Sequence, residues 1–442
     1  MTAIPAERPV RPFSVTHGEV LRISTPMTLA FLSTPLTGLI ATGVIGQLHD
    51  EAATGGVALA SVVFDVIFVT FNFLRGATTA FTAQAMGAGD RSEEQRMLAA
   101  ALSIALVAGL VLLVFQAPLG ALGLTLMGSE GRVDDMAKTY FHWRIWSAPF
   151  VLFNFVAFGW VLGRGNSFAG LVLQILLNGL NAGLSLAFVS GLGWGIEGVA
   201  MATLIAEAAT ALAGLWLIIT GTQKGAWRLP DRAALKRSFL VNGDMMIRTF
   251  ALLIGLSFFT RQSGALGLQP LAANTILLHY YFFGVGFLDG VATAAEQLAG
   301  RSVGARYRPA FDQTVRLTTL WGFVFAFVIA AAFAATGGMV IGWMSPSAAV
   351  TDLAHTFLPY VVALPVVSTL AFQMDGIYIG ATWSRQMRNL MLISLAVYFA
   401  AWALLQPMLG NHGLWIALLI FQSARSIAFR LMLPRLVERT FA

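Results

Sequence analysis

Three aspartates lie inside long apolar stretches of this sequence, where a charged side chain is costly. Asp65 interrupts the string VVFDVIFVTFNFLRG, Asp289 follows VGFL, and Asp375 follows AFQM. A charge at the centre of a bilayer costs roughly 2.5–3.5 kcal/mol on insertion scales, so such residues usually line cavities or pair with another group. In an apolar cavity a carboxylate can exchange protons near neutral pH. We therefore expect these aspartates to be sites of proton or ion coupling.

Two more titratable residues, Glu207 and His279, lie in apolar stretches and are further candidates for coupling. An imidazole titrates near physiological pH, but a lone histidine in an apolar helix is more often a hydrogen-bond partner. His279 has no second ligand at metal-binding spacing, so we predict no metal site. Glu207 can either line a cavity or make a polar contact between helices.

Each aspartate also has a purely structural interpretation. Asp65 can hydrogen-bond an amide such as that of Asn178 and never change its protonation state. Asp375 can form a buried ion pair with Arg248 or Arg261, and such a pair would hold helices together. The residue types alone do not decide between coupling and structure.

Aromatic side chains are abundant, with 33 Phe, 11 Trp and 7 Tyr among 442 residues. Most of them are expected to face lipid or to pack between helices. A minority is expected to line a cavity for flat lipophilic cations, which ring faces attract. Our candidates for this minority are Phe64, Phe68, Phe158, Tyr280 and Tyr281.

The composition assigns these residues to membrane-spanning helices. The chain is 57% hydrophobic and only 11% charged, whereas soluble domains carry about 25% charged residues. Apolar runs of the roughly 20 residues that cross a bilayer recur along the whole length. We predict an all-α polytopic membrane protein with about twelve transmembrane helices.

Lysine and arginine fall in alternate loops, and the intervening loops carry few of either. This distribution follows the positive-inside rule and predicts that both termini and the central loop are cytoplasmic. We expect no removable signal peptide in MTAIPAERPVRPFS, and we place the protein in the inner (plasma) membrane. Because the basic residues form no single patch, we expect no binding to nucleic acid.

An internal repeat divides the chain at the polar stretch TQKGAWRLPDRAALKR into residues 1–230 and 231–442, each with about six spans. FNFLRG resembles VGFLDG at an offset of 214, which pairs Arg75 with Asp289, whereas FGWVLG resembles DGIYIG at an offset of 217. An even number of spans per half gives both halves the same orientation. Secondary transporters use such repeats and bind substrate between them.

Catalytic and nucleotide-binding signatures are not found. The sequence has no P-loop, so ATP-driven transport by this chain alone is not expected, and it has no cysteine. No arrangement typical of hydrolases stands in a plausible soluble context. We predict a protein that is not an enzyme and that needs no cofactor.

Several longer strings resemble the multidrug and toxic compound extrusion (MATE) family, and its DNA-damage-inducible F branch in particular. The resemblance covers nearly the whole chain and includes FLRGATTAFTAQAMGAGD, LQILLNGLNAGLSLAFVSGLGWGIEGVA, LDGVATAAEQLAGRSVGAR and MDGIYIGAT. It implies two six-helix lobes, a central cavity, and export of small organic, often cationic, compounds driven by inward proton or sodium flow. We expect a monomer.

The sequence departs from the family's pattern at two positions associated with proton coupling. Where the family usually has an aspartate in its first helix, this chain has Ala41, and an acid often found in the fifth helix is Ser185 here, after Asn181. These losses predict that the proton site has moved to Asp65. They also leave two alternatives open: a sodium-coupled antiporter, since sodium-coupled members have an acid at the position of Asp375, and a lipid or metabolite flippase with little or no ion coupling.

The last group of predictions concerns polar positions on the same helices. We expect Ala41, Asn178, Asn181, Ser185 and Arg261 to line the cavity that receives the substrate.

Overall fold

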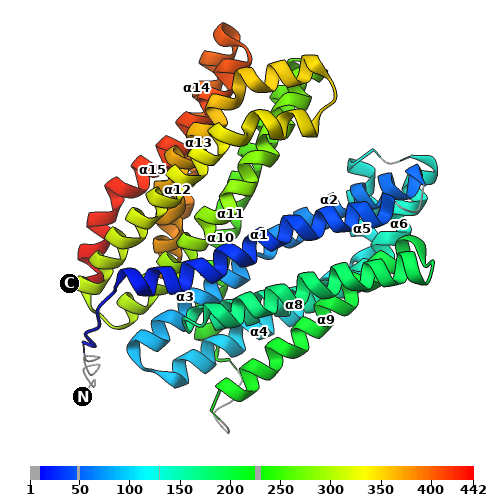
Figure 1. Cartoon of the computed structure of the whole chain (residues 1–442). Helices are drawn as coiled ribbons and strands as arrows, with labels where there is room; N and C mark the ends of the chain where they lie inside the picture. The colour runs from blue at the N-terminus through cyan, green and yellow to red at the C-terminus, as the bar shows by residue number, and fades with distance from the viewer. Residues whose placement is uncertain (1–9, 47–49, 129, 224–229) are drawn as a thin grey trace. The chain divides into compact units, whose positions relative to one another are not determined.

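The computed structural model describes residues 10–46, 50–128, 130–223 and 230–442, without the side chains of residues 35–42. Within these ranges every regular element is a helix (Figure 1). The helices of the first half are α1 (His17–Gly46), α2 (Glu51–Phe71), α3 (Phe73–Ala88), α4 (Arg91–Val114), α5 (Gln116–Leu126), α6 (Gly131–Arg144), α7 (Ala148–Gly163), α8 (Ser167–Leu186) and α9 (Gly195–Gly221).

The second half has fewer and longer helices. They are α10 (Arg232–Ala265), α11 (Leu268–Gly304), α12 (Arg308–Met344), α13 (Ala348–Gly380), α14 (Ser384–Leu409) and α15 (Asn411–Phe441). Eleven helical segments in the described ranges are long and apolar enough to cross a membrane, some of them joining consecutive helices such as α2 and α3. With α1, a further helix of 30 residues, this confirms the all-helical polytopic class.

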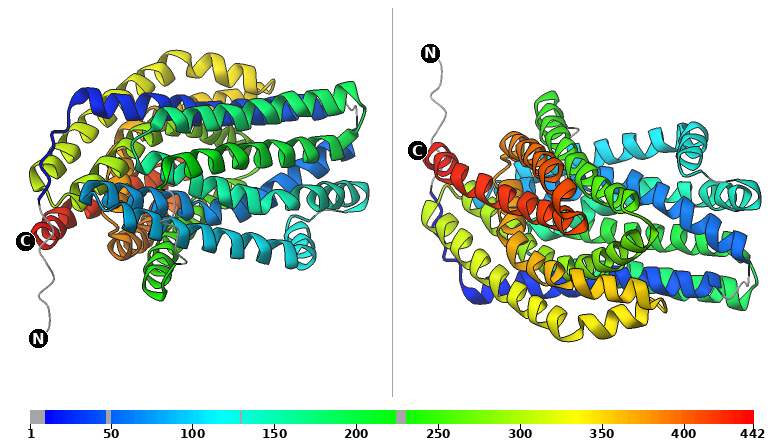
Figure 2. Two further views of the ribbon diagram at one scale, coloured as in Figure 1. Left: turned by 90° about the horizontal axis from the view of Figure 1, so that it is seen from below. Right: turned by 90° about the horizontal axis from the view of Figure 1, so that it is seen from above.

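The helices group into two units. The N-terminal unit comprises residues 29–82 and 90–240. In it α2 packs against α6, α4 against α7, and α8 against α9, and Figure 2 again shows the two green helices α8 and α9 running alongside each other. The core of this unit is a cluster of buried apolar side chains, among them Phe64, Phe141 and Trp160.

The C-terminal unit comprises residues up to 28, residues 83–89 and residues 241–442. Its centre is α13, which packs against α11, α12 and α15. Two prolines, Pro359 and Pro365, lie inside α13, where each removes a backbone hydrogen-bond donor and favours a kink. The proposed boundary between lobes at residues 230 and 231 stays a prediction.

The same close helix crossing occurs in each unit. A Cβ atom on Gly163 would lie 2.6 Å from the carbonyl oxygen of Thr79, and one on Gly380 would lie 2.1 Å from that of Glu296. Glycine is needed at both places because any side chain would collide with backbone. The two glycines are 217 residues apart in the sequence (380 − 163), and so are the two residues that they contact (296 − 79). The internal repeat is therefore seen in the packing contacts as well as in the sequence.

One turn away, a second pair of glycines corrects part of the alignment read from the sequence. Gly159 faces the carbonyl oxygen of Arg75, and Gly376 faces that of Ala292, again with an offset of 217 on both sides. The structural counterpart of Arg75 is therefore Ala292, and not Asp289. The match of Phe-Leu-x-Gly at an offset of 214 was misleading, because it aligned the two halves three residues out of the register that the structure shows.

Candidate functional site

A polar cavity of about 450 Å³ lies inside the N-terminal unit, between α1, α2, α6, α8 and α9. Eleven of the sixteen described residues that line it carry a hydrogen-bonding or charged side chain. Among them are four residues predicted from the sequence: Asp65, Asn178, Asn181 and Glu207. The fold thus brings together side chains that are up to 142 residues apart (207 − 65).

Asp65 projects from α2 into this cavity with its side chain exposed. It makes no hydrogen bond or ion pair with any residue in the described ranges. The amide of Asn178, proposed above as its structural partner, instead donates to Ser33 Oγ at 2.6 Å and accepts from Gln174 Nε2 at 3.2 Å. The carboxylate of Asp65 is therefore open to the cavity.

Arg144 supplies a cation to the same cavity from α6. Its Nη1 donates to Ser61 Oγ at 3.3 Å and to the Tyr140 hydroxyl at 3.1 Å. The guanidinium lies 4.7 Å from the centre of the Phe64 ring, a geometry that favours a cation–π contact. Arg144 interacts electrostatically with both Asp65 and Glu207, but it forms no direct ion pair with a described carboxylate.

Glu207 lines the cavity from α9 and is held by one amide. Asn154 Nδ2 donates to the Glu207 carboxylate at 2.7 Å and to its carbonyl oxygen at 3.0 Å. Next to it, Asn181 Nδ2 donates to Thr203 Oγ1 at 2.9 Å. The two carboxylates consequently differ: that of Glu207 is positioned by an amide, whereas that of Asp65 has no hydrogen-bond partner among the described residues.

Other predicted lining residues of this unit lie elsewhere. The rings of Phe64 and Phe68 are stacked at 5.6 Å and, like the buried Phe158 and Ser185, they are not among the described residues that line the cavity. Ala41 belongs to α1, but its side chain is outside the described part. Phe64 supports the cavity indirectly, because Arg144 rests on its ring.

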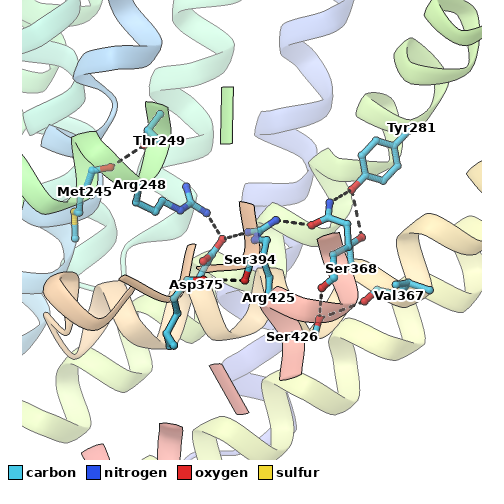
Figure 3. A network of polar contacts seen from close by, with 12 residues as sticks. Met245, Arg248, Thr249, Tyr281, Val367, Ser368, Asp375, Ser394, Arg425 and Ser426 are labelled. Carbon is cyan, nitrogen blue, oxygen red and sulfur yellow. Dashed lines mark hydrogen bonds and ion pairs between the residues drawn. The ribbon is translucent and has the colours of Figure 1, made fainter. Parts of the chain in front are cut away.

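In the C-terminal unit, two arginines contact the carboxylate of Asp375. Figure 3 shows Asp375 of α13 between Arg248 of α10 and Arg425 of α15. Arg425 Nη2 lies 2.7 Å from Asp375 Oδ2, and Arg248 pairs with the same oxygen. The Arg425 side chain is only 1% exposed, and that of Asp375 is 8% exposed. Of the two arginines considered above, Arg248 is the partner, whereas Arg261 is exposed on α10.

A chain of hydrogen bonds extends from this ion cluster (Figure 3). Arg425 donates to Gln422 Oε1 at 2.5 Å, Gln422 donates to the Tyr281 hydroxyl at 3.2 Å, and Tyr281 donates to Ser368 at 3.3 Å. Tyr281 is buried, so its hydroxyl serves this network.

The remaining candidates of the C-terminal unit are spread over α11. The Tyr280 hydroxyl bonds Thr336 at 2.6 Å, His279 is exposed, and Asp289 is half-buried. Their roles stay predictions. No group of three His, Asp or Glu side chains in the described part of the chain gathers closely enough to hold a metal ion.

Sequence reasoning missed Arg144, and it missed Arg425 as the second arginine on Asp375, whereas the pair of Asp375 with Arg248 was among its alternatives. Arg144 gave one signal, a charge inside a segment (Gly131–Gly163) that is otherwise apolar enough to span a membrane. Arg425 gave the same signal in α15. Nothing in the sequence indicated which acid each arginine faces.

Known proteins share both the sequence and the fold. The MatE family model matches residues 26–187 and 245–403. The chain is 33% identical to DNA damage-inducible protein F of Escherichia coli, over 92% of this chain and 89% of that protein. It is 26% identical to the probable multidrug resistance protein NorM of Caulobacter vibrioides, over 99% and 95% of the two chains.

A solved structure of the outward-facing conformation of a multidrug resistance MATE family transporter superposes with a TM-score of 0.88 at 20% identity, covering 96% of each chain. The sequence matches and the shared fold agree with each other along nearly the whole chain. This protein therefore belongs to the multidrug and toxic compound extrusion (MATE) family of multi-pass membrane transporters.

Proposed function

We propose that this protein exports small organic, often cationic, compounds by alternating access, and that proton uptake at Asp65 drives the export. The observation that carries the proposal is the open carboxylate of Asp65 in a polar cavity of about 450 Å³. That volume lies within the range of roughly 300–1,000 Å³ typical of small-molecule sites. The names of two relatives, a probable multidrug resistance protein and a multidrug export protein, support export.

The chemistry of the cavity suits an exchange of a cation for protons. With Asp65 and Glu207 ionised and Arg144 charged, these three groups sum to one negative charge, which favours an organic cation. Protonation of Asp65 removes that excess and weakens cation binding by roughly 1–4 kcal/mol at close range. A proton and a substrate cation thus compete for one site, which is the requirement for antiport.

The C-terminal unit offers a poorer coupling site. Asp375 shares one oxygen with Arg248 and Arg425, and both guanidinium groups would repel a sodium ion placed at that carboxylate. This arrangement favours a structural role for Asp375. This supports coupling to protons that bind at Asp65 rather than coupling to sodium ions that bind at Asp375.

The test uses purified protein in liposomes with a fluorescent organic cation and an imposed pH gradient. We expect gradient-driven transport by the wild type and a loss of about tenfold or more in Asp65→Asn, equivalent to roughly 1.4 kcal/mol, at a cation concentration that saturates the variant. Because asparagine is neutral like the protonated acid, the variant should also bind the cation more weakly than the wild type, by roughly 1–4 kcal/mol. Asp352→Asn is the matched control, because Asp352 is an exposed acid of α13 outside the cavity.

Three other outcomes would contradict the proposal. Unchanged transport by Asp65→Asn would remove this residue from coupling. Transport driven by a sodium gradient but not by a pH gradient would identify a sodium antiporter. Movement of lipid or metabolite that is independent of both gradients would identify a flippase.

A further inference from the structure

A second cavity, of about 460 Å³, lies in the C-terminal unit and has no part in the coupling site described above. Its sides are α12 and α15, and its floor is α13, which packs against both. The residues that line it come from the beginning of α12, from the end of α15 and, at the floor, from Leu370 and Met374 of α13. We call it the α12–α15 groove.

The mouth of the α12–α15 groove is basic. Its charged lining residues are Arg308, Arg316, Arg430, Asp312 and Glu438, with a net charge of +1 (3 − 2). Arg308 and Asp312 form an ion pair at 3.5 Å. Arg316 and Arg430 are exposed and make no hydrogen bond or ion pair with a residue in the described ranges. One further negative charge would therefore balance the groove.

The wall below these arginines is apolar. The accessible part of this wall comes from the half-buried Val315 and Leu370 and from the exposed Pro434, and an alkyl chain can cover it. The other apolar lining residues, Phe311, Met374, Leu433 and Val437, are buried. An organic anion without a hydrocarbon tail would leave this wall uncovered. A ligand that matches the whole groove needs one negative headgroup and an apolar tail.

The groove also lies at the depth where a lipid headgroup is found. Arg316 is eight residues from the first residue of α12, and Arg430 is eleven residues from the last residue of α15. At 1.5 Å per residue these positions are roughly 12 and 16 Å from the helix ends, and arginine side chains extend further towards the interface. Arg301 in the last turn of α11 and Arg306 in the loop before α12 add positive charge at this end of α12, so this end is the basic one that anionic leaflets attract.

We propose that the α12–α15 groove binds an anionic phospholipid, with its phosphate between Arg316 and Arg430 and an acyl chain on the apolar wall. Guanidinium groups bind phosphate oxygens in a fork geometry that is stronger than a point charge alone. Zwitterionic lipids carry a compensating cation in the headgroup, which Arg316 and Arg430 repel. The site therefore selects phosphatidylglycerol over phosphatidylcholine.

The experiment is native mass spectrometry of the delipidated full-length protein, titrated with phosphatidylglycerol or phosphatidylcholine of identical acyl chains. We expect the wild type to bind phosphatidylglycerol at least about tenfold more tightly, a difference of roughly 1.4 kcal/mol. The double variant R316Q/R430Q should lose that preference. R435Q should keep it, because Arg435 is an exposed arginine of the same helix that does not line the groove.

A second measurement on the wild type needs no variant. Raising the salt concentration should reduce the preference for phosphatidylglycerol, because salt screens exposed charges, and soluble glycerol phosphate should compete only weakly because it lacks the acyl chain. Equal binding of both lipids by the wild type would overturn the proposal, as would equal loss in R316Q/R430Q and R435Q. Competition by glycerol phosphate as strong as that of the lipid would overturn the lipid assignment.

Discussion

Replacing Asp375 by asparagine should be among the most destabilising single changes in the C-terminal unit. The substitution is nearly isosteric, so it creates no cavity, but it removes the charge that bridges Arg248 and Arg425. Two buried or half-buried guanidinium groups then face each other without compensation. Removing one member of a buried ion pair costs about 3–5 kcal/mol, and the 1% exposure of Arg425 puts this site at the buried end.

The matched control is Asp312→Asn. Asp312 pairs with Arg308 at 3.5 Å, and the two side chains are 59% and 56% exposed. Exposed pairs contribute about 0–1 kcal/mol, so the same chemical change should cost several-fold less. Both variants are measured by the equilibrium unfolding of purified protein in mixed micelles, followed by tryptophan fluorescence, without anionic lipid.

A double-mutant cycle then isolates the charge. Arg248→Met alone should be costly, but in the Asp375→Asn background the same change should cost less by about 1–3 kcal/mol, because it removes a cation that has already lost its partner. If Asp375→Asn unfolds within about 1 kcal/mol of the wild type, or if the two changes are additive, the ion cluster is not what holds α10, α13 and α15 together.

Three further outcomes can be checked with the same material. Gly380→Ala should destabilise the protein by about 1–3 kcal/mol, because its Cβ would lie 2.1 Å from the Glu296 carbonyl oxygen. Its control is Gly342→Ala, which has open space around it and should leave stability unchanged or raise it by up to about 1 kcal/mol. If unfolding in mixed micelles gives the reverse order, the close crossing at Gly380 is wrong. Asn274→Ala should lower the stability of the fold by about 1–3 kcal/mol, because it leaves Trp415 Nε1 without its acceptor at 2.9 Å. Thermal unfolding at the temperature of the wild type would refute this. Arg144→Gln should tighten equilibrium binding of an organic cation about fivefold or more, since removing one like charge is worth at least about 1 kcal/mol. Arg144→Lys keeps the charge and should not tighten binding. Equal affinities of the wild type and both variants would exclude Arg144 from the site.

Much of the fold could be predicted, because in a membrane protein a long apolar run usually indicates a helix that spans the bilayer. The long apolar runs predicted the helices, and the match of FGWVLG with DGIYIG at an offset of 217 predicted that Gly163 and Gly380 are equivalent positions. The structure shows these two glycines in equivalent contacts, with Thr79 and Glu296 respectively. The segment with an offset of 214 was misread. Short identities between apolar strings carry little information, because few residue types are used and many registers look similar.

The site was partly readable for a different reason. Asp65, Glu207, Asn178 and Asn181 stood out because polar atoms are costly in hydrocarbon, and all four line one cavity. Aromatic residues carry no such cost, so their sequence positions could not separate cavity walls from packing, and Phe64 proved to lie beneath an arginine.

The contrast between the two units also bears on why a membrane acid becomes available for coupling. Sequence marks Asp65 and Asp375 equally, as single carboxylates in apolar helices, but their neighbours differ. Asp375 has two guanidinium groups on one oxygen, and a proton arriving there would have to displace an arginine whose own charge would then be buried without a partner. Asp65 is open to a cavity and interacts with Arg144 without a direct ion pair, so it can gain or lose a proton without breaking such a contact. An acid that couples transport must have a partner near enough to keep its charge tolerable and far enough not to hold it permanently, and of these two aspartates only Asp65 has that arrangement in the described part of the chain.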